Sequence, residues 1–188
     1  MPSEYLRKLR ENDELRSSLA EFCDFDVEAP YSPMDIWFRL ASGRAFVPIA
    51  QTASCGVYAA LTEPRCGEHA VFFVSSEAQG GFIALDVRAA LELIVALPYW
   101  FDCLKFSGGG SLHEMERASA FLERDLQDEF EDVEGRRDRL RHELGIGVPR
   151  NPLHALNEAV TSGAVERIQS ISEGWDLASL FNSFTFDD

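Results

Sequence analysis

The chain has 188 residues, of which 46% are hydrophobic and 11% aromatic, a composition that fits one folded domain (1–188) and excludes a disordered chain. Its 32 acidic residues outnumber its 17 lysines and arginines, so the formal net charge is −15. This charge repels phosphate backbones and anionic lipid, so we expect no nucleic-acid partner and no membrane partner. If the charge has a partner, we expect a basic protein; the alternative is that it serves solubility alone.

The N-terminal segment and the cysteines predict a cytoplasmic location. Residues 1–18 contain no signal-peptide core, and no apolar run in the chain is long enough to span a bilayer. The four cysteines, Cys23, Cys55, Cys66 and Cys103, are widely separated and form no C-x-x-C pair. This spacing is typical of reduced thiols and gives no disulfide framework or zinc site, so we expect no metal and no cofactor.

Two helices are predicted in the first 43 residues. Leucines spaced among charges predict an amphipathic helix over 4–22. The segment SPMDIWFRLASG predicts a second helix, with Ser32 as the cap, Pro33 in the first turn and Gly43 after the end.

The middle of the chain predicts a β-meander. Four short runs rich in β-branched and aromatic residues are separated by turn residues: RAFVPIAQT, GVYAALT, HAVFFVSS and GGFIALD. Their close spacing favours antiparallel pairing, because parallel crossovers need a dozen or more residues. Alternation within GVYAALT predicts that one face of the sheet is better buried than the other.

Helices are predicted to follow the meander. Asp86 is the expected cap of a helix that packs on the sheet and stops at Pro98. After three glycines, a charged helical pattern over 111–144 predicts one long helix that protrudes from the body. In the tail, Asn151 and Pro152 begin a further helix, VERIQSIS reads as a strand, and an aromatic cluster closes the chain.

The glycines Gly108, Gly109 and Gly110 suggest either a phosphate cradle or a joint at which a helix departs. No Gly-Lys pair of a P-loop occurs in the chain, and the glycines do not continue into a dinucleotide fingerprint. Ser111 and Glu114 have capping-box spacing, and the first turns of the helix are acidic, which disfavours a bound anion. The joint is the favoured interpretation.

No pattern in the sequence supports catalysis. There is no G-x-S-x-G elbow and no H-E-x-x-H motif, and no cysteine is adjacent to a histidine. A Cys–His pair formed only in the folded chain, a histidine ligand and a pair of carboxylates remain open alternatives. We therefore expect a protein that is not an enzyme.

The charged helical segment is the most informative feature for function. Between Glu123 and Glu134, Arg124 is the only base, and four arginines follow over 136–141. One interpretation is a solvated helix stabilised by pairs such as Asp132–Arg136 and Glu134–Arg137. The other is an acidic surface for a basic protein. The predicted contact residues are Glu77, Glu123, Asp125, Asp128, Glu129, Glu131 and Asp132.

Residues 44–110 resemble the core of the SUKH superfamily, the SMI1/KNR4-type proteins. The resemblance lies in the turn Ser54-Cys55-Gly56, the strand with Val57-Tyr58, the pattern Val74-Ser75-Ser76-Glu77 and the helix from Asp86 to Leu97. PYWFDCLKFSGGG and EGWDLASLFNSF are similar to recurrent segments of bacterial relatives. SPMDIWFRLASG stands where members of the family carry a Leu-Pro … Asn-Gly segment.

This resemblance implies an α+β fold with a central antiparallel sheet, about four to six strands, flanked by helices. It also implies an immunity protein that binds a cognate toxin, with no catalytic residues. Two alternatives stay open: a regulatory protein that binds a small molecule or nucleotide at the FSGGG segment, and a homodimeric scaffold zipped through Leu126, Val133 and Leu140.

Overall fold

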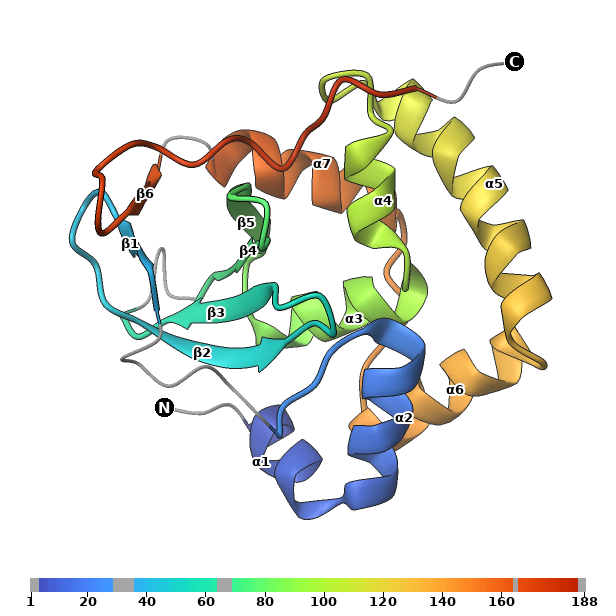
Figure 1. Ribbon diagram of the computed structural model, residues 1–188. Coiled ribbons are helices and arrows are strands. Elements are labelled where there is room, and N and C mark those ends of the chain that lie inside the picture. Colours follow the sequence, from blue (N-terminus) through green and yellow to red (C-terminus); the bar gives the residue numbers. More distant parts are fainter. Residues whose placement is uncertain (1–3, 29–35, 64–68, 164–165, 186–188) are drawn as a thin grey trace.

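The computed structural model describes residues 4–28, 36–63, 69–163 and 166–185 (Figure 1). The helices are α1 (Glu4–Glu11), α2 (Asp13–Cys23), α3 (Val87–Ala96), α4 (Trp100–Lys105), α5 (Leu112–Glu129), α6 (Val133–Leu144) and α7 (Pro152–Gly163). The strands are β1 (Phe38–Leu40), β2 (Phe46–Gln51), β3 (Val57–Leu61), β4 (Val71–Val74), β5 (Gly80–Ala84) and β6 (Ile168–Ser170). The predicted α+β class is confirmed.

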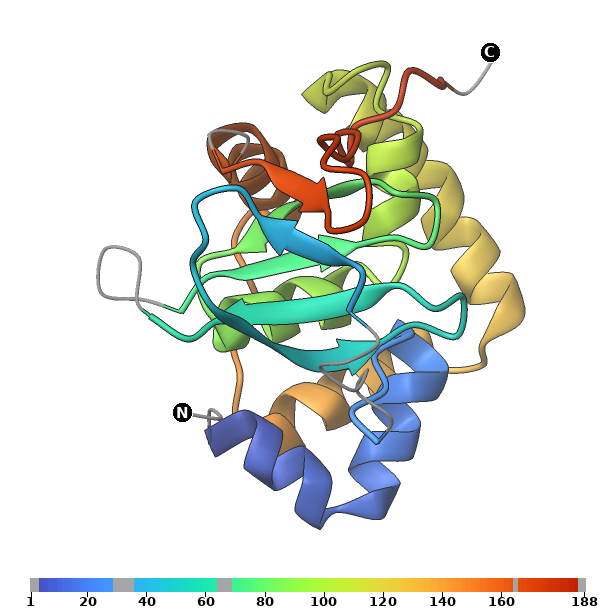
Figure 2. The same ribbon diagram turned by 60° about the vertical axis from the view of Figure 1, so that its left-hand side comes forward.

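The central sheet has four antiparallel strands in the order β2-β3-β4-β5, which confirms the predicted meander. Strands β1 and β6 pair separately as a two-stranded antiparallel sheet. Figure 2 shows this second sheet in front of the first, with helix α3 behind it. The central sheet therefore lies between a layer of helices and a small β layer.

Both faces of the sheet are buried, so the prediction of one better-buried face was wrong. All five residues of β3 are buried. Tyr58 and Ala60 belong to the core shared with the helices, whereas Val57, Ala59 and Leu61 belong to the core shared with β1 and β6. The alternation along β3 thus separates two cores, because successive side chains point to opposite faces of a sheet.

The first 43 residues differ from prediction in two places. The expected helix over 4–22 is two helices, because the Asn12 side chain accepts a hydrogen bond from Leu15 N at 3.1 Å and so caps α2. In SPMDIWFRLASG, Phe38–Leu40 form strand β1 instead of a helix, since Phe38 and Leu40 are buried and Arg39 between them is exposed. The predicted cap, Ser32 and Pro33, lies outside the described residues.

Helices α3 and α4 lie against the sheet. Asp86 caps α3 as predicted, accepting from Ala89 N at 2.7 Å, and the helix ends two residues before Pro98. Trp100 of α4 is buried, and its Nε1–H donates to the buried Tyr58 hydroxyl at 3.1 Å. This bond joins helix α4, beyond Pro98, to strand β3.

The predicted single protruding helix over 111–144 was wrong. It is two helices, α5 and α6, and both lie on the body: α5 packs against α4 and α7, and α6 against α2 and α3 (Figure 1). Leu126, Val133 and Leu140 are buried in the core of their own chain. They are therefore not available as the zipper of a homodimer in this conformation.

The tail follows its prediction more closely. Helix α7 starts at Pro152, and β6 falls within VERIQSIS. In the aromatic cluster Leu180 is fully buried, Trp175 and Phe184 are exposed, and Phe186 lies outside the described residues. In the part of the chain that the structure describes, no helix is long and apolar enough to cross a membrane.

Candidate functional site

The predicted contact acids gather mainly where α5 turns into α6. Helix α5 ends at Glu129, Phe130 is extended, and α6 begins after Asp132. We call the five carboxylates of this turn the acidic elbow. They are Asp125, Asp128, Glu129, Glu131 and Asp132, and all five are exposed.

The elbow forms because Asp132 adopts a left-handed conformation (φ 55°, ψ 50°) and caps α6. Its carboxylate accepts a hydrogen bond from Gly135 N at 3.2 Å. A Cβ atom at Gly135 would lie 2.5 Å from Asp132 Cγ, so a larger residue there would displace the Asp132 carboxylate from its present position. On the inner side, Phe130 packs edge-on against Phe22 of α2, with 5.4 Å between ring centroids. The chain therefore bends at Phe130–Asp132 instead of continuing as one helix.

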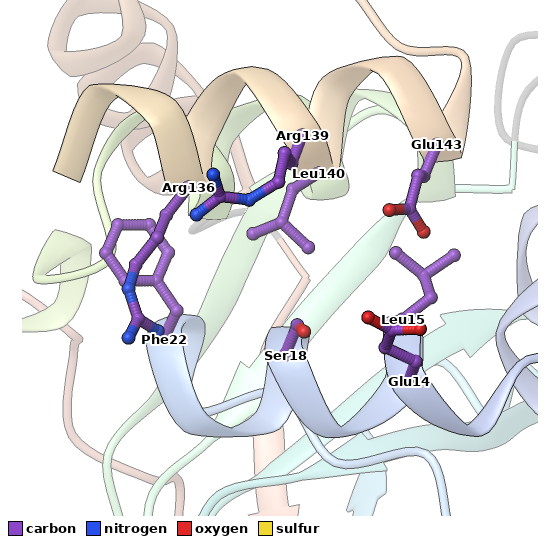
Figure 3. A pocket seen from close by; sticks show the side chains of 8 residues that line it. All are labelled: Glu14, Leu15, Ser18, Phe22, Arg136, Arg139, Leu140 and Glu143. Atoms are coloured by element: carbon purple, nitrogen blue, oxygen red, sulfur yellow. The ribbon is translucent and has the colours of Figure 1, made fainter. Parts of the chain in front are cut away.

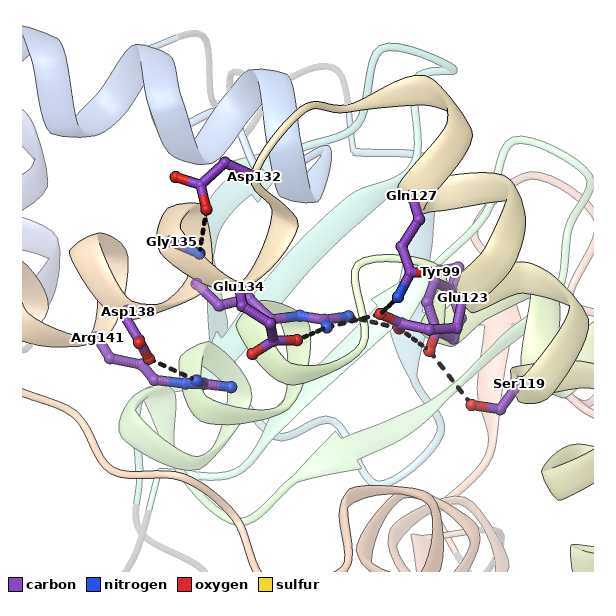
Figure 4. Close-up of polar contacts among 10 residues, drawn as sticks. Tyr99, Ser119, Glu123, Gln127, Asp132, Glu134, Gly135, Asp138 and Arg141 are labelled. Carbon is purple, nitrogen blue, oxygen red and sulfur yellow. Dashed lines mark hydrogen bonds and ion pairs between the residues drawn. The ribbon is translucent and has the colours of Figure 1, made fainter.

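A buried arginine, Arg137, joins helix α5 to helix α6 through the carboxylates of Glu123 and Glu134, and Figure 4 labels these two carboxylates. The Arg137 side chain of α6 is 6% exposed and donates to both carboxylate oxygens of Glu123 on α5, at 2.8 and 2.7 Å. It also donates to Glu134 at 2.6 Å, which confirms the predicted Glu134–Arg137 pair. The Tyr99 hydroxyl, just before α4, donates to Glu123 at 2.6 Å. This clamp links α4, α5 and α6, and no sequence signal pointed to Tyr99 or to the pairing of Arg137 with Glu123.

Glu123 therefore has a structural role in the clamp, and its assignment as a contact residue stays a prediction. Partial burial alone would raise the pKa of Glu123, but the hydrogen bonds from Arg137 and Tyr99 outweigh it and lower the pKa below its ordinary value. Burial and the hydrogen bond to the Glu123 carboxylate together raise the pKa of Tyr99. Glu123 is thus ionised at neutral pH and committed to neighbours within the chain.

Unlike Glu123, the five acids of the acidic elbow face solvent and have few ionic partners among the described residues. Asp132 lies 3.4 Å from Arg139, whereas Arg136 pairs with Glu21 at 3.6 Å, so the predicted Asp132–Arg136 pair does not form. Asp125, Asp128, Glu129 and Glu131 form no ion pair within the described residues; these four we call the free acids. Of the two pairs expected for a solvated helix that stabilises itself, Glu134–Arg137 therefore forms and Asp132–Arg136 does not.

Glu77 lies apart from the elbow. It is exposed in the turn between β4 and β5, where the neighbouring Ala78 carbonyl accepts a hydrogen bond from Ala178 N at 3.0 Å. The elements that form this turn contribute nothing to the elbow. The structure therefore brings five of the seven predicted contact acids together, assigns Glu123 to the clamp and leaves Glu77 alone.

The triglycine segment is a docking site for the C-terminal tail. Gly108 N donates to Phe184 O at 2.9 Å, and Gly109 N donates to Asn182 O at 2.7 Å. The Ser107 hydroxyl also donates to Asn182 O, at 3.2 Å. These N–H groups are the ones that a phosphate cradle would need, and here tail carbonyls occupy them. Ser111 caps α5 by accepting from Glu114 N at 3.4 Å, as predicted.

Replacement of Gly110 tests this docking. Gly110 has φ +104°, and a Cβ atom there would lie 3.2 Å from the Phe181 ring. We expect Gly110→Ala to lower the free energy of unfolding by about 2 kcal/mol, measured by urea denaturation. Gly109→Ala is the matched control, because Gly109 has φ +86° with open space around it, and should cost about 1 kcal/mol. Equal losses in the two variants would contradict the contact with the tail.

A small cleft lies between α2 and α6 beside the elbow (Figure 3). Its volume is about 80 Å³, with Leu15, Phe22 and Leu140 in its walls. Arg136 and Arg139 lie toward one end, and two carboxylates lie toward the other in Figure 3. The cleft is smaller than the pockets of about 300–1,000 Å³ that usually hold ligands.

Metal-binding clusters are absent from the described residues, and two of the cysteines are buried. No group of three or more His, Cys, Asp or Glu side chains there could hold a metal ion. Cys23 and Cys103 are buried, and burial raises the pKa of both thiols, that of Cys103 to about 12. These two cysteines are therefore protonated and unreactive at neutral pH.

Comparison with known proteins found no matching family model, no matching curated protein and no matching solved structure.

Proposed function

We propose that this chain is a non-enzymatic protein-binding module that recognises a basic protein through the acidic elbow. One observation carries the proposal: four exposed carboxylates, without ionic partners among the described residues, lie at the end of α5 and in the turn that leads to α6, and the buried Arg137 clamp joins these two helices. A rigid array of like charge binds an oppositely charged surface with little loss of conformational entropy.

Electrostatics explains how such a surface would work. The net charge of −15 attracts a basic protein over long range, and the free acids provide the local contact. Pairs between exposed charges contribute little energy singly, so the array should act mainly on association rate and on orientation. Binding would therefore weaken steeply as salt is raised.

The resemblance of residues 44–110 to the SUKH superfamily suggests the identity of the partner. Bacterial members of that superfamily commonly serve as immunity proteins, which bind a secreted toxin in the cytoplasm and block it. The partner would then be a basic toxin domain, occluded sterically and electrostatically by the elbow. The observed α+β fold and the exposed acids are compatible with this role, and the resemblance supplies its biological setting.

The proposal is tested by immobilising the chain and passing lysate and secreted fraction of the source organism over it, once at low and once at high salt. We expect wild-type chain to retain one basic protein that is released by salt and is lost with the elbow variant. The elbow variant carries Asp125→Asn, Asp128→Asn, Glu129→Gln and Glu131→Gln. The control variant loses the same number of charges elsewhere, through Glu4→Gln, Glu11→Gln, Glu63→Gln and Glu116→Gln.

The two variants separate a specific surface from general charge. We expect the elbow variant to weaken binding of the captured protein about a hundredfold and the control variant less than about threefold, measured by titration calorimetry. Equal losses in both variants would show that net charge alone attracts the partner and would refute the elbow as the contact surface.

A further inference from the structure

A groove runs between helices α3 and α7 along the end of strand β5, and these elements contribute nothing to the acidic elbow. Two hollows of about 320 and 190 Å³ meet there, since both are lined by Ala84, Leu85, Ala159 and Ser162. The larger hollow reaches the lower end of the volume range of ligand-binding pockets. Most of its walls are apolar side chains.

Exposed hydrophobic residues border the groove. Leu85 lines both hollows and is 66% exposed. Val148 is 70% exposed and precedes Pro149, which lines the larger hollow. These are the two most exposed large hydrophobic side chains among the described residues. An apolar hollow bordered by exposed apolar side chains is typical of a protein-docking surface.

The shape of the groove favours a helix over an extended strand. Gly80 N, at the start of β5, already donates to Ala178 O of the tail at 2.8 Å, and α7 packs along the same strand. The groove at the other end of β5 is lined mainly by side chains of α3 and α7. On α7 its wall consists of small residues, Ala155, Ala159 and Ser162, which allow another helix to approach closely.

The charged side chains of the groove indicate which residues should flank the apolar face of a bound helix. Glu92 and Glu158 are the only charged side chains among the described residues that line the larger hollow. Glu92 is held by Arg88 at 2.9 Å, whereas the Glu158 side chain is 71% exposed, 3.4 Å from His154. We propose that this groove is a second interaction surface, which takes the apolar face of an amphipathic helix of a partner protein, flanked by lysines or arginines.

Two synthetic helical peptides of about 15 residues test this inference. Both carry leucines on one face; one has lysines and the other glutamates beside that face. Binding is measured by fluorescence anisotropy at about 0.15 M salt, where charges close to the groove still interact, and the elbow variant measures any attraction to the elbow. We expect the lysine peptide to bind wild-type chain at least about tenfold more tightly than the glutamate peptide.

Two substitutions in the groove test whether the lysine peptide binds there. Ala159→Phe fills the groove and should weaken the lysine peptide at least about tenfold, as should Leu85→Ser, whose exposed side chain leaves folding intact. The elbow variant should change its affinity less than about twofold, so failure of the groove and failure of the elbow are distinguishable. Two results would overturn the inference. One is that neither peptide binds saturably, and the other is that the lysine peptide binds Ala159→Phe, Leu85→Ser and wild type with equal affinity. A wild-type dimer that Ala159→Phe converts to a monomer would assign the groove to a second copy and would also overturn it.

Discussion

Replacing Trp100 by alanine should lower the free energy of unfolding by about 4 kcal/mol. The Trp100 side chain is 2% exposed and packs against the rings of Tyr58, Phe73 and Phe101, with centroids 6.0, 5.1 and 5.5 Å away. Alanine would leave a cavity between α4 and the sheet, and the buried Tyr58 hydroxyl would lose its hydrogen bond from Nε1. Since domains of this size are stable by about 5–15 kcal/mol, the variant should be close to unfolding at 37 °C.

Urea denaturation followed by circular dichroism measures this effect. Trp175→Ala is the matched control, because Trp175 is 41% exposed and packs at the surface. It should cost about 1 kcal/mol or less. A loss below about 2 kcal/mol for Trp100→Ala would show that Trp100 does not join α4 to the sheet in solution.

Replacing Arg137 by methionine should cost about 3 kcal/mol, the second largest effect that we expect. The change leaves the Glu123 carboxylate, whose side chain is 26% exposed, without its main cationic partner. A buried charge that loses its partner is far more costly than a broken surface pair. Arg139→Met removes the same charge from a side chain that is 62% exposed, and it should cost less than about 0.5 kcal/mol.

The double variant Arg137→Met/Glu123→Leu separates stability from geometry. It should recover most of the stability lost in Arg137→Met, because an apolar pair can replace a buried ion pair at little cost. Arg137 Nε is already buried without a hydrogen-bond partner among the described residues, so the native pair is incompletely satisfied. No recovery in the double variant would contradict the assignment of Glu123 as the partner of Arg137.

The clamp also predicts a pH dependence. The pKa of Glu123 is lower in the folded chain than its ordinary value of about 4.3. Its ionised form therefore stabilises the fold fully above about pH 4.3, and this contribution is lost as pH falls through the lower folded value. The stability difference between wild type and Glu123→Gln should be constant from neutral pH to about pH 5 and shrink below pH 4. A constant difference down to pH 2 would contradict it.

Local chemistry explains why much of the fold was predictable. Asp86 and Ser111 cap α3 and α5 as expected, since a cap needs only a side-chain oxygen and the amide three residues on. The meander was predictable because its turns are short. Strand β1 was not, because its partner β6 lies more than 120 residues away and the local grammar of SPMDIWFRLASG favours a helix.

The candidate site was predictable in charge but not in shape. A run of acids signals a negative surface, and five of the predicted residues do meet at the elbow. The bend itself depends on Phe130 packing against Phe22 and on the Asp132 cap, and the spacing of Leu126, Val133 and Leu140 suits a straight helix equally well. The role of Glu123 in the clamp was not predictable, because only tertiary structure places Tyr99 and Arg137 beside it.

Hydrogen exchange of the chain with and without the captured basic protein tests the central claim most directly. If the acidic elbow is the contact surface, amides over 125–132 should exchange at least about tenfold more slowly in the complex, whereas those of the β4–β5 turn at Glu77 should be unchanged. The account would be contradicted if, in a saturated complex, the amides over 125–132 exchanged as fast as in the free chain while amides elsewhere were protected.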